Sequence, residues 1–138
     1  MNSAMTIAVS GMLAASTSLT ASASNLANLQ SDGPVPATDP QQPVAPAPGS
    51  VYQPVQVTDT ARPGGGVSAA ASPSLPVYTL AYDPTAPFAN VQGMVAQPNV
   101  NPAREVVSQI TASLAYKANI ATFKTAQEME KSLLDALA

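Results

Sequence analysis

Apolar and small residues recur at a spacing of seven along the first 30 residues of the chain. Two series, offset by three residues, carry this repeat: Met5, Met12, Leu19 and Leu26, and then Ala8, Ala15, Ser22 and Leu29. This is the a/d heptad pattern of helices that pair with other helices. No charged residue occurs among the first 31 positions. The pattern predicts one helix over residues 3–30 that needs a partner helix, because an isolated helix cannot bury such a stripe.

A second long helical pattern occupies residues 102–138. Asn101 is a favourable N-cap, Pro102 suits the first helical position, and Glu105 lies near the positive end of the helix dipole. Two apolar stripes follow: Val107, Ile110, Leu114, Ala118, Ala121, Thr125 and Met129 on one face, and Tyr116, Ile120, Phe123, Leu134 and Leu137 on a neighbouring face. Either the helix has several neighbours, from its own and other chains, or both stripes surround one wide core.

The middle of the chain changes character twice. Prolines are frequent over residues 33–50, which favours an extended linker or an arm that follows the surface; Gly33 is a candidate for a left-handed helix C-cap. Alternating patterns then predict strands over residues 51–57, 67–71 and 75–82, with a turn at 62–66 and an irregular loop over 83–101. We therefore expect a mainly α fold with a small β region, divided into residues 1–32, 33–50, 51–101 and 102–138.

The composition narrows the classes of function. The net charge is −3, and none of the five basic residues precedes Arg62, so a surface that binds nucleic acid is not expected. The chain has no histidine and no cysteine, which removes the usual general base, zinc sites and thiol chemistry. The Gly64–Gly66 triplet lacks the Lys-Ser/Thr of a phosphate loop. We expect no catalytic, cofactor or metal site, and an enzyme is the least favoured class.

The N-terminus has some features of a targeting signal. Ile7–Ala15 is largely apolar, and Ala21-Ser22-Ala23 has the small-x-small form of a cleavage site. However, no Lys or Arg precedes the apolar run, and Ser and Thr dilute it well below the ~20 apolar residues of a membrane span. The heptads also continue through the candidate cleavage site. We expect the segment to be retained in the mature protein and not to span a membrane.

Three segments, in order along the chain, resemble the bacterial flagellar axial proteins, which are the rod, hook and hook-associated subunits. Ala23–Asn28 is similar to the Ala-Ser-x-Asn-Leu-Ala-Asn signature of that family. The segment before the last helix, with Asp83-Pro84, Pro87, Gly93, Val95 and Pro98–Asn101, is similar to that of the proximal-rod type. Ala112-Ser113, Tyr116 and Ala118-Asn119 match the motif Ala-Ser-Arg-x-Tyr-x-Ala-Asn. The resemblance covers residues 3–30 and 83–138.

The chain also departs from the family pattern. Leu114 stands where the family usually has Arg, and Leu29–Gly33 replaces the usual Thr-x-Gly-Tyr ending. The proline-rich residues 34–50 have no clear counterpart. These departures leave open which subunits the protein contacts, and whether it serves a primary or a secondary flagellar system.

The resemblance implies a structural subunit that polymerises into the tubular rod of the basal body through paired terminal helices. It further implies passage unfolded through the flagellar type III export apparatus, without signal-peptide cleavage. Partners would be copies of itself and other rod subunits. We expect the terminal helices to be largely disordered in the free monomer, since an Ala/Ser-rich seam buries little area. The alternatives are another rod- or hook-type subunit, or a secreted coiled-coil adhesin or adapter cleaved near Ala23.

The candidate helix-pairing and subunit-interface residues follow from the heptads, the apolar stripes and the motifs. Asn25 and Asn28 could bond across helices or merely terminate one. The full candidate set is Met5, Ala8, Met12, Ala15, Leu19, Ser22, Asn25, Leu26, Asn28, Leu29, Val107, Ile110, Leu114, Tyr116, Ala118, Asn119, Ile120 and Phe123.

Overall fold

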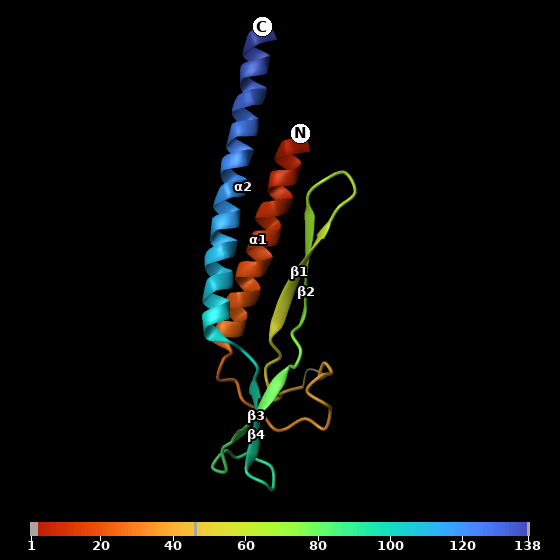
Figure 1. Cartoon of the computed structure of the whole chain (residues 1–138), viewed down its shortest axis with the longest axis vertical. Coiled ribbons are helices and arrows are strands. Elements are labelled where there is room, and N and C mark those ends of the chain that lie inside the picture. Colours follow the sequence, from red (N-terminus) through yellow and green to blue (C-terminus); the bar gives the residue numbers. More distant parts are fainter. Residues whose placement is uncertain (1–2, 46, 138) are drawn as a thin grey trace.

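Two long antiparallel helices form the main body of the molecule in the computed structural model, which describes residues 3–45 and 47–137 (Figure 1). Helix α1 is Ser3–Ala27 and helix α2 is Pro102–Leu137. Two separate two-stranded antiparallel sheets lie between them in sequence: β1 (Val55–Ala61) with β2 (Val67–Pro73), and β3 (Tyr78–Tyr82) with β4 (Met94–Pro98). The expected mainly α fold with a small β region is confirmed.

The end of α1 differs from the sequence prediction. The helix ends at Ala27 rather than at residue 30, and the Asn28 side-chain amide closes its last turn by donating to the Ser24 carbonyl at 2.9 Å. Gly33 is not a left-handed C-cap, because it is not among the glycines with positive φ. Instead, Gly33 and Ala96 of β4 exchange two backbone hydrogen bonds of 2.9 Å. A side chain at Gly33 would collide with the backbone of Val51, whose nitrogen would lie 2.4 Å from the new Cβ.

Helix α2 begins where the sequence predicts. The Asn101 side-chain oxygen accepts a hydrogen bond from the Arg104 backbone N–H at 3.1 Å, which is the N-cap geometry. The helix has 36 residues and α1 has 25. At ~1.5 Å per residue this makes α2 about 16 Å longer than α1. The C-terminal part of α2 therefore extends beyond the N-terminal end of α1 (Figure 1).

The strands are shifted from the predicted ranges. The strand expected over 51–57 begins only at Val55 and continues to Ala61. Val51 and Pro54 belong to the loop before the strand, where both are buried. The strand expected over 67–71 continues to Pro73, and the one expected over 75–82 begins only at Tyr78. Strand β4 lies within the expected loop over 83–101. Its residues are mostly buried, so the strand lacks the alternation that would have revealed it.

A small apolar core joins the second sheet to the proline-rich arm. Val51, Val77, Tyr78 and Ala96 form its centre, and Val35 and Val44 of the arm pack against it. The Tyr78 hydroxyl donates to the Thr38 carbonyl at 2.8 Å. Burial, together with the nearby carboxylate of Asp39, raises the pKa of Tyr78. The arm therefore follows the surface of the core.

The β1–β2 hairpin lies alongside α1 (Figure 1). The turn predicted at residues 62–66 joins its strands, and Gly64, Gly65 and Gly66 take φ values of 91°, 98° and 84°. At the end of this turn the hairpin approaches α1 so closely that a Cβ at Gly66 would lie 2.4 Å from the Ser10 hydroxyl oxygen. Glycine is thus needed here for both backbone conformation and space.

Candidate assembly interface

The side chain of Asn25 connects three elements at one end of the helix pair. Its amide nitrogen donates to the Val55 carbonyl at 2.8 Å and to a Glu105 carboxylate oxygen at 3.1 Å. Its amide oxygen accepts from the Val55 backbone N–H at 2.9 Å and from the Tyr52 hydroxyl at 3.0 Å. Asn25 is only 2% exposed, so these bonds satisfy a buried amide that would otherwise destabilise the fold. Asn25 thus bonds across helices, to Glu105 of α2, and this is the first of the two roles that the sequence allows for the asparagines.

Asn28 behaves differently from Asn25. Its amide donates within its own helix turn, and its oxygen accepts a hydrogen bond from the Ser31 hydroxyl at 3.1 Å. Asn28 therefore has the second role that the sequence allows, which is to end the helix. The two asparagines of the signature thus have separate roles.

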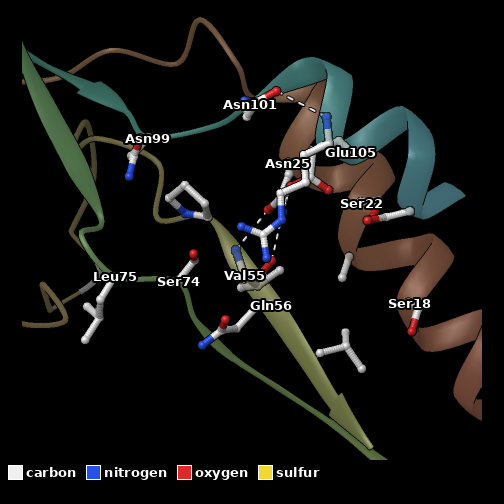
Figure 2. A pocket seen from close by; sticks show the side chains of 15 residues that line it. Ser18, Ser22, Asn25, Val55, Gln56, Ser74, Leu75, Asn99, Asn101 and Glu105 are labelled. Atoms are coloured by element: carbon white, nitrogen blue, oxygen red, sulfur yellow. Dashed lines mark hydrogen bonds between the residues drawn. The ribbon is translucent and has the colours of Figure 1, made fainter.

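Figure 2 shows the cleft beside Asn25, where α1, the start of α2 and the start of β1 meet. Asn25 and Glu105 lie close together in it, and Ser18 and Ser22 lie further along α1 (Figure 2). Within the described parts of the chain, no group of three or more Asp, Glu, His or Cys residues could hold a metal ion. The cleft is a structural junction held together by hydrogen bonds.

Small residues line the contact between α1 and α2. Ala8, Ala15 and Ser22 of α1 are buried, as are Ala112 and Ala126 of α2. The helices are close together at Gly11, where an added Cβ would lie 2.5–2.7 Å from three side-chain atoms of Asn119. The helices are therefore close together, but the contact buries little apolar area per residue.

The candidate residues of the N-terminal segment take several environments. Met5, Ala8, Ala15, Ser22 and Asn25 are buried; Met12, Leu26, Asn28 and Leu29 are half-buried; and Leu19 is exposed. The two heptad series thus contribute four of the eight buried residues of α1, namely Met5, Ala8, Ala15 and Ser22. Leu19 is the one member of the two heptad series that its own chain leaves exposed.

The candidate residues of α2 divide into two groups. Asn119, Ile120 and Phe123 are half-buried, whereas Tyr116 and Ala118 are exposed. Val107, Ile110 and Leu114 are 62%, 56% and 60% exposed. At ~100° per residue, Leu114 points about 200° away from Ala112, which faces α1. The stripe that contains Val107, Ile110 and Leu114 is therefore not covered by the protein's own chain, and the two stripes do not surround one wide core.

Sequence reasoning missed several residues that hold the helices and hairpin together. Ser10 accepts a hydrogen bond from the Val67 backbone N–H at 3.1 Å, and Tyr52 bonds to Asn25. Gly11 was not recognised as a contact point, although a glycine within a helix often marks a close approach. Ser10 and Tyr52 had no comparable signal, because their partners lie 57 and 27 positions away in the sequence.

Helix α1 meets the length and hydropathy criteria for a helix that could cross a membrane, with a mean hydropathy of 1.3 over 18 residues. By length and composition alone, this finding does not decide whether the helix spans a membrane, so the expectation that it does not stays a prediction. Core helices of soluble proteins and signal sequences meet the same criteria, so they carry little weight alone.

Comparison with known proteins identifies the family. Residues 91–136 match the family described as "Flagellar basal body rod FlgEFG protein C-terminal". The flagellar basal-body rod protein FlgC of Buchnera aphidicola from Acyrthosiphon pisum is 39% identical over 126 residues, which cover 89% of this chain and 88% of that protein. The FlgC protein of Salmonella typhimurium is 36% identical over 129 residues, 89% of this chain and 87% of that protein.

A shorter match has a higher sequence identity. The FlgC protein of Buchnera aphidicola from Schizaphis graminum is 48% identical over 50 residues, which cover 36% of this chain and 37% of that protein. The longer matches extend over most of both partners and so include the helices and the region between them. The chain therefore belongs to the family of the flagellar basal-body rod protein FlgC.

Proposed function

We propose that this chain is a structural subunit of the proximal rod of the bacterial flagellar basal body, and that it polymerises through its terminal helices. The observation that carries the proposal is the distribution of side chains on α2. This helix turns small residues such as Ala112 toward α1 and leaves Val107, Ile110 and Leu114 exposed. An exposed apolar stripe on a long helix is typical of a surface that another protein covers.

The free energy available from this stripe is substantial. Full burial of a Val, Leu or Ile side chain contributes about 1.5–3 kcal/mol. Val107, Ile110 and Leu114 each have more than half of their surface still exposed, so a neighbouring helix that covers them gains several kcal/mol per subunit. The α1–α2 contact itself uses Ala, Ser and Gly and contributes less per residue. Assembly thus supplies the apolar burial that the single chain lacks.

The projecting end of α2 supports the same role. The C-terminal part of α2 extends beyond α1 (Figure 1), and the last five residues of the helix include the exposed Leu133, Leu134 and Leu137. Since α1 does not reach this part of α2, these leucines are available to helices of neighbouring subunits. We assign residues 1–32 and 102–138 to the helical core of the rod, and residues 33–50 and 51–101 to an arm and a β region around it.

We further propose that α1 serves for pairing between protein helices and not for crossing a membrane. Its buried polar side chains, Ser10, Ser22 and Asn25, include two that bond to the hairpin. The chain would pass unfolded through the flagellar type III export apparatus, keep its N-terminal segment, and fold into helices on joining the rod. Its partners are copies of itself and other rod subunits. It has no enzymatic role and needs no cofactor.

Intact-mass measurement of the subunits of purified basal bodies tests the proposal. We expect the chain to be present with residues 1–23 retained. A chain cleaved near Ala23 and found outside basal bodies would instead support a secreted adhesin or adapter. Its presence in the hook, and not in the rod, would support another type of axial subunit.

A further inference from the structure

Both strands of the β1–β2 hairpin have an outer edge, and the register in which the strands pair defines which backbone groups point there. The Arg62 N–H donates to the Gly66 carbonyl, and the Ser74 N–H donates to the Pro54 carbonyl. In an antiparallel pair, hydrogen-bonded residues alternate with residues whose N–H and C=O point outward. The even-numbered residues of β1 therefore bond to β2, and the odd-numbered residues of both strands point their backbone groups outward.

Helix α1 already occupies one outward position on each strand. Asn25 bonds to both the N–H and the carbonyl of Val55, which is the first residue of β1. Ser10 accepts a hydrogen bond from the N–H of Val67, which is the first residue of β2. These bonds agree with the alternation, because both residues are odd-numbered. They also hold the hairpin against the helix, so that its remaining edges have a fixed orientation.

Among the residues that the structure describes, none forms a hydrogen bond with the remaining outward backbone groups on either edge. On β1 these groups belong to Val57, Asp59 and Ala61, and on β2 they belong to Ala69 and Ala71. Strand β2 has the sequence VSAAASP, without a charged residue. Natural proteins usually protect exposed strand edges with lysine, proline or a bulge, because an open edge pairs with other strands. Pro73 gives such protection only at the last position of β2.

We propose that the open edge of β2 pairs with the open edge of β1 in a second copy of this chain, so that successive copies build one continuous antiparallel sheet. The two strands of a hairpin run in opposite directions. When copies stand side by side in the same orientation, β2 of one copy is therefore antiparallel to β1 of the next. Such a contact joins two different surfaces, and contacts of this kind generate rings or open helical filaments.

The choice of a second copy as the partner rests on this complementarity. Each chain has two open strand edges, and the two strands run in opposite directions. Three outward residues on β1 and two on β2 have a backbone N–H that could donate to a neighbouring strand. The side chains of β2 are small, so they do not keep a neighbouring backbone away. The inference rests on the proposed function, because it needs copies that are aligned in the same direction, as they are in a rod.

Cysteine cross-linking in assembled basal bodies tests the pairing, and the chain has no native cysteine to interfere. Thr58→Cys in one copy would be combined with Ser68→Cys, Ala70→Cys or Ser72→Cys in another, so that three registers are sampled. These even-numbered residues would occupy the non-hydrogen-bonded positions of the new ladder, where side chains are closest. A single cysteine per copy prevents the bond between Thr58 and Ala70, which are partners within one chain.

We expect an oxidised dimer from at least one mixed pair, and none from Thr58→Cys or Ala70→Cys alone. A dimer from Ala70→Cys alone would indicate two copies related by a two-fold axis and would overturn the proposal. Chain present in basal bodies without any mixed dimer would also overturn it, while leaving the rod function intact. Absence of the chain from basal bodies would contradict both.

A proline substitution provides a second test. Ala71→Pro removes an outward N–H and keeps the internal hydrogen bonds of the hairpin. Leu80→Pro is the matched control, because the bonds from Asp83 N–H to Gly93 and from Asn99 N–H to Val77 place the Leu80 N–H on the outer edge of β3. We expect Ala71→Pro to abolish the mixed dimer and Leu80→Pro to leave its yield unchanged. An unchanged dimer in Ala71→Pro would overturn the proposal.

Discussion

The side chain of Asn25 pairs with the backbone of Val55 as a neighbouring strand would. It donates to the Val55 carbonyl at 2.8 Å and accepts from the Val55 N–H at 2.9 Å. The same amide donates to Glu105 of α2. One residue of the signature therefore fixes both the hairpin and the second helix against α1. This explains in physical terms why an amide is suited to this position, since it needs both a donor and an acceptor.

The first prediction concerns Asn25→Asp. The carboxylate keeps the acceptor but loses the donor, so the Val55 carbonyl is left unsatisfied and the new charge faces Glu105. An unsatisfied buried group costs about 1–3 kcal/mol. We expect strongly reduced incorporation into basal bodies, measured by quantitative mass spectrometry.

Asn28→Asp is the matched control for Asn25→Asp. Asn28 bonds only to residues 24 and 31 of its own segment. The control should therefore be incorporated at nearly normal levels. If incorporation into basal bodies falls equally in the two variants, Asn25 does not have the specific role described here.

The second prediction concerns the close approach of the helices at Gly11. Gly11→Ala adds a methyl group within 2.5–2.7 Å of the Asn119 side chain, so the helices must separate or Asn119 must move. Overpacking of a core costs about 1–3 kcal/mol, and the cost here is at the low end of this range or below it, because the colliding atoms are the end of a half-buried side chain. We expect reduced incorporation of Gly11→Ala into basal bodies.

Shortening the opposing side chain should reverse this effect. The double variant Gly11→Ala/Asn119→Ala removes the atoms that collide, and we expect it to recover most of the lost incorporation. Asn119→Ala alone controls for loss of the Asn119 bond to the Ala115 carbonyl. If the double variant loses as much incorporation as the two single variants lose together, Gly11 and Asn119 do not interact.

Much of the fold could be predicted from the sequence, because the features concerned are local. The heptads of α1, the N-cap at Asn101 and the glycine turn each depend on neighbouring residues, and the structure has all three. Strand β4 and the role of Gly33 depend on contacts that are distant in sequence. Propensity contains no information about such contacts, so these features could not be foreseen.

The interface residues were only partly predictable for a related reason. Their hydrophobicity led to the prediction that Val107, Ile110 and Leu114 are pairing residues. The contact between α1 and α2 within the chain instead uses smaller residues such as Ala112. A periodic pattern shows which face of a helix is apolar, but it does not show which neighbour covers that face. Only the packing of α1 against the other side of α2 separates these two cases.

The third prediction concerns the exposed stripe of α2. Leu114 is 60% exposed, so Leu114→Asp should leave export and the folding of the single chain nearly unchanged. In the rod, however, the charge would be buried against a neighbour without a partner. We expect loss of motility with normal secretion, measured by swarming and by the amount of exported chain.

Gln127→Asp is the matched control for Leu114→Asp, since Gln127 is exposed on α2 outside the apolar stripe. It introduces the same charge and should retain motility. If Leu114→Asp cells swim normally, the stripe is not a subunit contact.

The fourth prediction concerns Tyr78, whose pKa is raised by burial and by Asp39. A raised pKa means that the folded state holds the phenolic proton more tightly than the unfolded state. The resulting stability is present below the unfolded pKa of about 10 and is lost as the pH rises through the folded pKa. We expect the arm over residues 33–50 to loosen at alkaline pH, as measured by limited proteolysis.

Two phenylalanine variants separate Tyr78 from the other tyrosines. Tyr78→Phe loses the bond to Thr38, which contributes about 0.5–1.5 kcal/mol, and should remove most of the alkaline loosening. Tyr82→Phe, at a largely exposed position, should retain it. Identical pH profiles for all three proteins would assign the loosening to other groups.

The fifth prediction concerns the free monomer. The α1–α2 contact is made largely by Ala, Ser and Gly, and the remaining apolar residues of α2 are exposed, so the helix pair has little burial to offset the conformational entropy lost on folding. The region with Val51, Val77 and Tyr78 has a small core of its own. Hydrogen exchange on the free chain should therefore show fast exchange in α1 and α2 and slower exchange in β3 and β4. The same helices should become protected in isolated rods. A monomer whose helices are as protected as those of the rod would show that the single chain is already stable before it assembles.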